Sequence, residues 1–469
     1  MNRLSEREAV LEILSKIREE GTYSHVAVKE MLDRCEREGM ERRQRAFVKR
    51  LAEGVIERRI ELADVIRRYV RKGTRIRPVV RDILQMGIFQ ILYMDAVPDS
   101  AACNEAVKLT KACGKKELSG FVNGVLRTVV REKEKGVFDA PVHGQEGSGA
   151  AAEDLPALSR QYSMPEWIVR MWTDQLGAEE TGQLLAALME IRPVSIRFDE
   201  RIPADEACQT LERMREKGVQ YEMGHYLPYC RYLTQTDSIS ALPGYREGLW
   251  AVQDESSMMV AEAAGLTGKE TVYDVCAAPG GKSMHCAAKL LTAAMKDGGE
   301  PGHVYAFDIS KGKVSQTGKN VRRMHLGNVK VQQRDALSPI PCEEKDAADV
   351  LLCDLPCSGL GVIGRKRDIK YHVSPQQLRE LSKLQKEILG NVTGYLKEGG
   401  RLIYSTCTIN RGENEEIADF IEKELGFAPD PLAPHLPASL TVGERENCLQ
   451  LLPHRHGTDG FFIARFVKK

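Results

Sequence analysis

The most informative segment of the chain is Thr271-Val272-Tyr273-Asp274-Val275-Cys276-Ala277-Ala278-Pro279-Gly280-Gly281-Lys282. Its first half is a short apolar run that is typical of a buried strand, and its second half is a turn of small residues that leads into a helical pattern over 281–291. Gly280 and Gly281 permit close backbone approach and unusual φ angles, and the start of the helix presents free N–H groups. Such a loop can hold a carboxylate or a phosphate.

Around this segment, short apolar runs alternate with helical patterns from Leu249 onward. The predicted strands are 271–276, 303–309, 329–334, 349–353, 401–405 and 461–466, and the predicted helices are 281–291, 311–326, 375–396 and 413–425. That order predicts a doubly wound, mostly parallel sheet, so we expect a Rossmann-like α/β domain over 249–469.

The carboxyl ends of the predicted strands carry acidic side chains and thiols. Asp308, Asp335 and Asp354 stand where three of the strands end, and Cys357 and Cys407 follow the fourth and fifth strands. In open α/β sheets, ligands bind beyond these ends. Helix capping explains any one of the five residues but explains all five poorly, so we expect a ligand site at this edge of the sheet.

The loop and the next strand end indicate an adenosine-bearing cofactor. The loop is neither G-x-G-x-x-G nor G-x-x-x-x-G-K-[ST], which disfavours a dinucleotide or a nucleoside triphosphate. Asp308 lies where ribose hydroxyls can be bound, although it is further from Gly281 than the usual ~20 residues. We interpret residues 296–302 as a loop insertion that accounts for the excess.

The cysteines near this edge include candidates for a nucleophile. A buried cysteine usually acts as a small hydrophobe, which suits Cys353 inside its strand. Cys357 lies on a tight loop after a proline and Cys407 lies where a strand stops, so either thiol could become a thiolate nucleophile. These residues alone do not rank the two thiols. The twelve cysteines lack paired CxxC spacing, so we predict no metal site and reduced thiols in a cytoplasm.

The region before the α/β domain has a different pattern. From Ser5 to about Lys135 the apolar residues recur at helical spacing, which predicts an all-helical domain over 1–135. Residues 136–155 are rich in Gly, Ala and Ser and are interpreted as a flexible linker. Residues 156–248 mix helical and strand patterns, including a strand at 194–198, and are predicted to form a small α+β domain.

The charges balance overall but not along the chain. The 67 basic residues equal the 67 acidic ones, yet residues 1–140 carry 29 basic and 22 acidic residues, a net of +7. The balance excludes a uniformly basic nucleic-acid coat and an acidic disordered protein. Basic residues cluster at 42–50, 67–77, 311–334 and 365–370. Each cluster could be a solvated face, but together they are candidates for RNA phosphate contacts.

No feature of the sequence indicates a membrane. The charged start has no apolar signal-peptide region, and no run of about 18 apolar residues exists. We therefore expect a cytoplasmic protein without a membrane partner.

Six motifs in the second part of the chain resemble those of the S-adenosylmethionine-dependent RNA cytosine-C5 methyltransferases. They are Val252–Ser257, Val275–Lys282, Asp354–Gly359, Tyr404–Thr408, Gly412–Glu415 and Asp459–Phe462. They come in order with compatible spacing over roughly 156–469. The stretches Asp99–Val107 and Gly120–Arg127 resemble the helical NusB-like RNA-binding domain. The combination is similar to the RsmB (Sun/Fmu) branch, which modifies a cytosine of bacterial 16S rRNA.

The resemblance implies a role for each matching residue. Cys407 would be the nucleophile that adds to C6 of an unpaired or flipped cytosine, Cys357 would assist the later elimination, and Asp354 would contact the N3/N4 edge of the base. S-adenosylmethionine would be bound by Cys276, Ala277, Ala278, Pro279, Gly280, Gly281, Lys282, Asp308, Asp335 and Asp354. The resemblance further implies an RRM-like fold for 156–248 and a monomer acting on 16S rRNA.

The sequence departs from the family pattern at two positions outside the chemistry. Arg367 stands where the family often has proline, and Asp199 stands where asparagine is more usual.

Three other functions are weighed against this one. A tRNA cytosine-C5 methyltransferase would share the catalytic motifs, but the NusB-like domain favours the rRNA branch. A non-catalytic RNA-binding or ribosome-assembly factor would not need both Cys357 and Cys407. A nicotinamide dehydrogenase lacks its phosphate-binding fingerprint here and leaves both cysteines unexplained.

Overall fold

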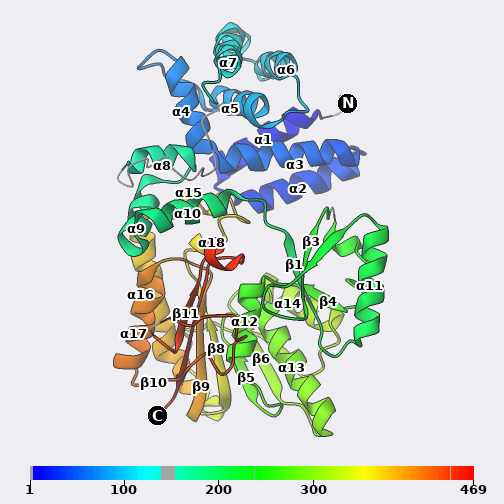
Figure 1. Cartoon of the computed structure of the whole chain (residues 1–469), viewed down its shortest axis with the longest axis vertical. Helices are drawn as coiled ribbons and strands as arrows, with labels where there is room; N and C mark the ends of the chain where they lie inside the picture. The colour runs from blue at the N-terminus through cyan, green and yellow to red at the C-terminus, as the bar shows by residue number, and fades with distance from the viewer. Residues whose placement is uncertain (1–3, 139–153, 237, 444) are drawn as a thin grey trace. The chain divides into compact units, whose positions relative to one another are not determined.

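The computed structural model describes residues 4–138, 154–236, 238–443 and 445–469 (Figure 1). The chain divides into a helical unit, formed by Met1–Glu190 and Arg365–His372, and an α/β unit, formed by Ile191–Gly364 and Val373–Lys469. Most of the expected linker, residues 139–153, lies outside the described residues. The chain thus contributes a second, short segment to the helical unit from within the sequence of the α/β unit.

The helical unit confirms the all-helical pattern of its sequence. Its longer helices are α1 (Glu6–Glu20), α2 (Ser24–Arg37), α3 (Arg42–Glu57), α4 (Arg59–Tyr69), α5 (Pro78–Tyr93), α6 (Asp99–Ala112), α7 (Ser119–Glu134), α8 (Leu155–Gln161), α9 (Glu166–Leu176) and α10 (Ala178–Met189), and α15 (Ile369–His372) is a short one. A capping box between Ser5 and Glu8 starts α1. Every residue of α5 from Ile83 to Ile91 is buried, so this mostly apolar helix lies at the centre of the unit.

Helix α3 packs against α5 at a glycine. A Cβ atom on Gly54 would lie 1.9 Å from Cζ of Phe89, whose ring is fully buried. The missing side chain therefore leaves the space that the Phe89 ring fills.

The α/β unit contains a small antiparallel sheet in the order β2-β3-β1-β4. Its elements are β1 (Val194–Phe198), α11 (Ala204–Glu216), β2 (Gln220–Met223), β3 (Cys230–Thr234) and β4 (Trp250–Val252). Ile196, Met214 and Trp250 belong to one apolar cluster, which shows that α11 covers one face of this sheet. The four strands and α11 lie within the range predicted for the small α+β domain, 156–248, whereas α8, α9 and α10 of that range belong to the helical unit.

The larger sheet has the order β10-β12-β9-β8-β5-β6-β7, with β11 paired to β12 (Figure 1). Its strands are β5 (Thr271–Asp274), β6 (His303–Asp308), β7 (Val329–Gln333), β8 (Ala348–Asp354), β9 (Leu396–Thr406), β10 (Ala428–Pro429), β11 (Cys448–Leu451) and β12 (Phe461–Val467). Strands β5 to β9 run parallel, and β10, β11 and β12 are antiparallel to their neighbours. The prediction of a mostly parallel, doubly wound sheet is confirmed. The strand order reverses between β5 and β8, which creates a crevice at their carboxyl ends.

Helices cover both faces of this sheet because consecutive strand residues are apolar. Val272 packs in the cluster that contains residues of α12 (Glu255–Ala263), α13 (Gly281–Asp297) and α14 (Lys311–Arg323). The next residue, Tyr273, packs in the cluster that contains residues of α16 (Pro375–Val392) and α17 (Glu415–Lys423). The two-residue period of a strand produces both layers.

The expected loop insertion at 296–302 is wrong in its extent. Helix α13 continues to Asp297 and ends at Gly298, whose N–H donates to the Ala294 carbonyl in a left-handed cap. The extra sequence between Gly281 and Asp308 is therefore mainly additional helix.

Among the described residues, no helix is both long enough and apolar enough to cross a membrane.

We expect Gly54→Ala to destabilise the helical unit by about 1–3 kcal/mol, because the new methyl group overlaps the Phe89 ring. The measurement is the thermal unfolding midpoint of the full chain. Gly124→Ala in α7 is the matched control, since Gly124 is exposed and has no atom within 4 Å of its Cβ position. Gly124→Ala should raise stability by up to about 1 kcal/mol, and equal effects of the two substitutions would contradict the packing argument.

Candidate functional site

The structure brings most of the predicted site residues to the carboxyl edge of the large sheet. The 276–282 loop follows β5, Asp308 is the last residue of β6, and Asp354 is the last residue of β8. Cys407 comes directly after β9. Since β5 lies between β6 and β8, the loop and both carboxylates border the crevice where the strand order reverses.

The loop after β5 is shaped by its glycine pair. Gly280 has a φ of +99° and forms the N-cap of α13, and its N–H donates to the Ala277 carbonyl at 2.7 Å. A Cβ atom there would lie 2.7 Å from Cγ2 of Thr317. The backbone at the start of α13 carries no side-chain cap at this position, so its first N–H groups suit a carboxylate ligand.

Asp308 connects β6 to this loop. Its carboxylate accepts from the Ala278 N–H at 3.3 Å and from the Ser310 N–H at 2.9 Å, and it is 7% exposed. Each carboxylate oxygen can still accept a further bond, as from a ribose hydroxyl. A carboxylate beside a helix start at the strand crossover fits the ribose and amino-acid ends of S-adenosylmethionine.

Asp335 lies apart from this set, on the turn after β7. It is exposed, and its Oδ1 accepts from the Leu337 N–H at 2.9 Å. Its contact with a cofactor stays a prediction.

Lys282 and Asp354 form an ion pair at the base of the crevice. Lys282 Nζ lies 2.6 Å from Asp354 Oδ2, and the side chains are 12% and 28% exposed. Burial lowers the pKa of Lys282, but attraction to the Asp354 carboxylate outweighs it and the net pKa is raised. Ser405 Oγ donates to the other oxygen, Asp354 Oδ1, at 3.1 Å. The pair therefore presents an oriented carboxylate held by a permanent cation.

The two candidate thiols meet at this edge. Cys357 Sγ and Cys407 Sγ are 3.3 Å apart, and both residues are partly exposed. The hydrogen bond to Cys407, followed by burial, raises the pKa of the Cys357 thiol well above its usual range. Either sulfur can be the donor in this contact.

Other thiols near the site are unreactive by comparison. Burial raises the pKa of Cys276 to about 12 and that of Cys353 well above its usual range. Cys353 lies fully buried inside β8, as expected for a small hydrophobe.

A buried carboxylate, that of Glu413, joins the loops of the two thiols. It accepts from Ser358 N at 2.8 Å, Ser358 Oγ at 2.5 Å and Asn410 Nδ2 at 2.8 Å. Ser358 Oγ also lies 2.7 Å from Thr408 Oγ1. Ser358 and Thr408 are the residues that follow Cys357 and Cys407, so this network sets the distance between the thiols.

Sequence reasoning missed the role of Glu413 and also a second contact, at Gln253. Gln253 Oε1 accepts from Arg197 Nε of β1 at 3.0 Å. The Gln253 side chain also lies 3.7 Å from the Cβ position of Gly281. Both residues stand inside recognised motifs, but only the folded structure shows that they position the cysteine loops and the start of α13.

Asp274 was also missed as a site residue. It is buried at the end of β5 and accepts from Ser283 Oγ at 2.5 Å. Burial raises its pKa to about 7. This carboxyl thus anchors the first turn of α13 beneath the cofactor loop.

The basic residues of 311–334 divide into two groups. Arg323 donates to the carbonyls of Tyr245 and Trp250, and Arg334 pairs with Glu344. The exposed members remain candidates for phosphate contacts: Lys311, Lys313, Lys319, Arg322 and Lys330.

In the 365–370 cluster the prediction of a phosphate contact is wrong for Lys370. Its side chain is 1% exposed, and Nζ donates to the Glu57 carbonyl at 2.9 Å. Lys366 is exposed. Asp199, which stands where the family more usually has asparagine, is buried and pairs with Arg201 at 2.6 Å. Its role is therefore structural.

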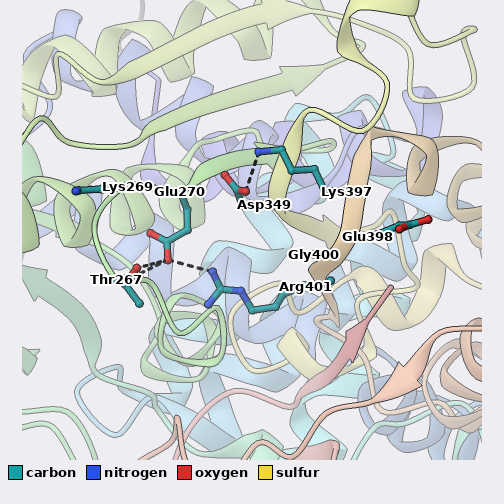
Figure 2. Close-up of a pocket in the computed structure, with 9 residues that line it drawn as sticks. Thr267, Lys269, Glu270, Asp349, Lys397, Glu398, Gly400 and Arg401 are labelled. Atoms are coloured by element: carbon teal, nitrogen blue, oxygen red, sulfur yellow. Dashed lines mark hydrogen bonds and ion pairs between the residues drawn. The ribbon is translucent and has the colours of Figure 1, made fainter. Parts of the chain in front are cut away.

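A separate pocket of about 370 Å³ lies at the start of β5, β8 and β9, the opposite edge of the sheet (Figure 2). Four of its charged side chains form two pairs: Lys397 with Asp349 at 2.8 Å, and Arg401 with Glu270 at 3.1 Å. Burial raises the pKa of Glu270, but hydrogen bonds from Thr267 and Gly268 outweigh it and lower the pKa to about 2. These groups are already satisfied, so they stabilise the strand ends.

Comparisons with known proteins agree with this fold. A family model described as 16S rRNA methyltransferase RsmB/F matches residues 263–467, and the NusB family model matches residues 4–131. The solved structure of NSun6 from Pyrococcus horikoshii has a TM-score of 0.56 at 21% identity, covering 65% of this chain and 98% of that chain. Fold and site define a methyltransferase that uses S-adenosylmethionine and carries a NusB domain.

Two curated relatives extend over the whole chain. The probable ribosomal RNA small subunit methyltransferase B of Bacillus subtilis is 34% identical over 471 residues, covering 100% of both chains. The protein of the same description from Synechocystis is 32% identical over 468 residues, covering 99% of this chain and 100% of that protein. The chain belongs to the family of ribosomal RNA small subunit methyltransferases B.

We expect Glu413→Gln to lower the free energy of unfolding by about 1–3 kcal/mol. The amide NH2 group of glutamine would face hydrogen-bond donors where a carboxylate oxygen now accepts, so those bonds would be lost. Methylation should fall roughly tenfold or more, since the thiols lose their fixed spacing. Thermal unfolding and single-turnover rates measure the two effects. Glu416→Gln, on the exposed side of α17, is the matched control and should change neither. Wild-type turnover in Glu413→Gln would contradict the positioning role.

Proposed function

We propose that this enzyme transfers a methyl group from S-adenosylmethionine to C5 of a cytosine in 16S rRNA, through a covalent bond between Cys407 and C6. The observation that carries the proposal is the pair of thiols, 3.3 Å apart, beside the Lys282–Asp354 ion pair. Family membership supports the rRNA substrate.

The first step is addition of the Cys407 sulfur to C6. C5 of cytosine is a poor nucleophile, and this addition makes it enamine-like. The raised pKa of the Cys357 thiol favours Cys407 as the sulfur that attacks as a thiolate.

Asp354 orients and activates the base. Its carboxylate accepts a hydrogen bond from the N3/N4 edge of cytosine and stabilises the protonated ring, while Lys282 holds the carboxylate in place. S-adenosylmethionine, held by the 276–282 loop and Asp308, supplies the electrophilic methyl group. The target base must be unpaired or flipped to enter the crevice.

Cys357 completes the reaction by promoting loss of the C5 proton. The Cys407 sulfur is a neutral thioether in the adduct, so the bond that most raises the pKa of Cys357 is then gone. With that bond gone, the Cys357 thiol can release its proton to solvent, and the resulting thiolate can take the C5 proton. Removal of the C5 proton restores the aromatic ring, and the C6–S bond breaks with its electron pair returning to Cys407.

RNA binding is assigned to the expected helical domain, 1–135, and to the small domain, 156–248. Arg71, Lys72, Arg75 and Arg77 are exposed in the turn between α4 and α5 and suit phosphate contacts. The proposal includes a cytoplasmic monomer, which light scattering of the purified chain tests. Asp335 is included as a further cofactor contact.

Replacing the two cysteines separates their roles. Cys407→Ala should abolish both methylation and covalent adducts, whereas Cys357→Ala should trap an adduct between protein and RNA. Denaturing gels with 16S rRNA fragments and labelled cofactor measure both outcomes. Cys208→Ala, at an exposed position, is the control and should behave as wild type. Covalent adducts that still form in Cys407→Ala would contradict the assignment of Cys407 as the nucleophile.

The RNA substrate is tested in a strain that lacks the gene. Bisulfite sequencing should show loss of one 5-methylcytosine in 16S rRNA and no change in tRNA. Loss from tRNA alone would favour a tRNA methyltransferase instead.

A further inference from the structure

The segment Arg365–His372, here called the strap, folds as part of the helical unit. It begins eight residues after Cys357 in the sequence. Asp368 is 2% exposed and Lys370 is 1% exposed, so charged side chains of the strap are buried in that unit. Burying charges costs free energy unless each one is paired, which indicates that the strap has specific partners.

Asp368 caps the first turn of α2. Its two carboxylate oxygens accept from Ser24 N at 2.5 Å and Ser24 Oγ at 2.6 Å, and His372 Nε2 lies 3.2 Å from Oδ2. The helix has no side-chain cap of its own at Tyr23 and no acidic residue in its first turn. The strap thus supplies the negative charge that a helix start favours, from 344 residues away in sequence.

The strap also closes the last turn of α3. Lys370 Nζ donates to the carbonyl of Glu57, the final residue of the helix, at 2.9 Å. Arg367 pairs with the Glu57 carboxylate at 2.7 Å. The Arg367 cation complements the dipole at this helix end, and the Lys370 donor satisfies its last carbonyl. One short segment therefore satisfies opposite ends of two helices.

A third contact fixes the strap at Tyr371. Its hydroxyl donates to the Glu57 carbonyl at 3.3 Å and lies 3.5 Å from Ser163 Oγ. Ser163 Oγ in turn accepts from the Ile60 N–H at 2.9 Å. The strap is therefore held at several points rather than by a single side chain.

These anchors restrict the loop that carries Cys357. The connection from β8 to α16 spans residues 355–374, a length that would be unusual for an irregular loop without internal support. At its start, the Gly361 N–H donates to the Cys407 carbonyl at 3.0 Å. Further along the same connection the strap is bound within the helical unit, so the Cys357 loop is tied to that unit through the chain.

We propose that the strap makes the helical unit a positioning element for Cys357, with Asp368 and Lys370 as the positioning residues. The helical unit then contributes to release of the covalent adduct as well as to RNA binding. This inference rests on the proposed role of Cys357 in elimination.

The test measures alkylation of Cys357 by iodoacetamide in the full chain, followed by mass spectrometry. Asp368→Asn keeps the shape but removes the charge, and it should speed labelling of Cys357 about five- to tenfold, the scale expected from a lost cap. Labelling of the exposed Cys208 in the same sample is the internal reference. Lys366→Gln, at an exposed strap position, is the matched control and should label as wild type.

Hydrogen exchange and adduct assays separate the outcomes. Faster exchange in α2 with unchanged labelling of Cys357 would overturn the proposal, because the strap would then stabilise only the helical unit. Faster labelling together with accumulated adduct supports it. Faster labelling without adduct supports the positioning role and contradicts the proposed chemistry of Cys357. If Asp368→Asn does not fold, Arg367→Gln is used in its place. It removes only the ion pair between Arg367 and Glu57, and the same labelling, exchange and adduct measurements are interpreted in the same way.

Discussion

The catalytic edge depends on one buried charge, the carboxylate of Glu413. An ionised carboxylate is stable in such a place only when donors surround it, and Ser358 and Asn410 provide them. Because those donors belong to the chain segments that carry the two thiols, satisfying the charge also fixes the sulfur positions. Stability and catalytic geometry therefore rest on the same hydrogen bonds, and neither can be altered without the other.

Much of the fold was predictable because its signals are local. Apolar residues at consecutive strand positions, such as Val272 and Tyr273, require helices on both faces of the sheet. Parallel strands bring their carboxyl ends to one edge, so Asp308, Asp354 and Cys407 could be grouped without coordinates. The extent of α13 was misjudged, because a glycine-rich end resembles a loop until its cap is seen. The start of the small domain was also misjudged, because α8, α9 and α10 belong to the helical unit.

The partners of individual side chains were not predictable. Glu413 stands in a motif that resembles a helix start, yet its donors come from a loop 55 residues earlier. Gln253 and Arg197 meet across 56 residues of sequence. Motif matching identifies such positions. The physical reason for them lies in long-range contacts, which the helix and strand periodicities of the sequence do not reveal. The resemblance ranked the two cysteines, and the raised pKa of the Cys357 thiol agrees with Cys407 as the nucleophile.

Charge runs along the sequence overcount nucleic-acid contacts for the same reason. Lys370 and Lys366 lie in one basic cluster, but one caps a helix inside the helical unit and the other faces solvent. Arg323 and Arg322 are neighbours in α14, yet Arg323 is bound to backbone carbonyls and Arg322 is exposed. A buried cation with carbonyl or carboxylate partners is already neutralised and contributes little to phosphate attraction. The electrostatic footprint for RNA is therefore set by the cations that folding leaves without such partners, and overall neutrality of the chain does not bear on it.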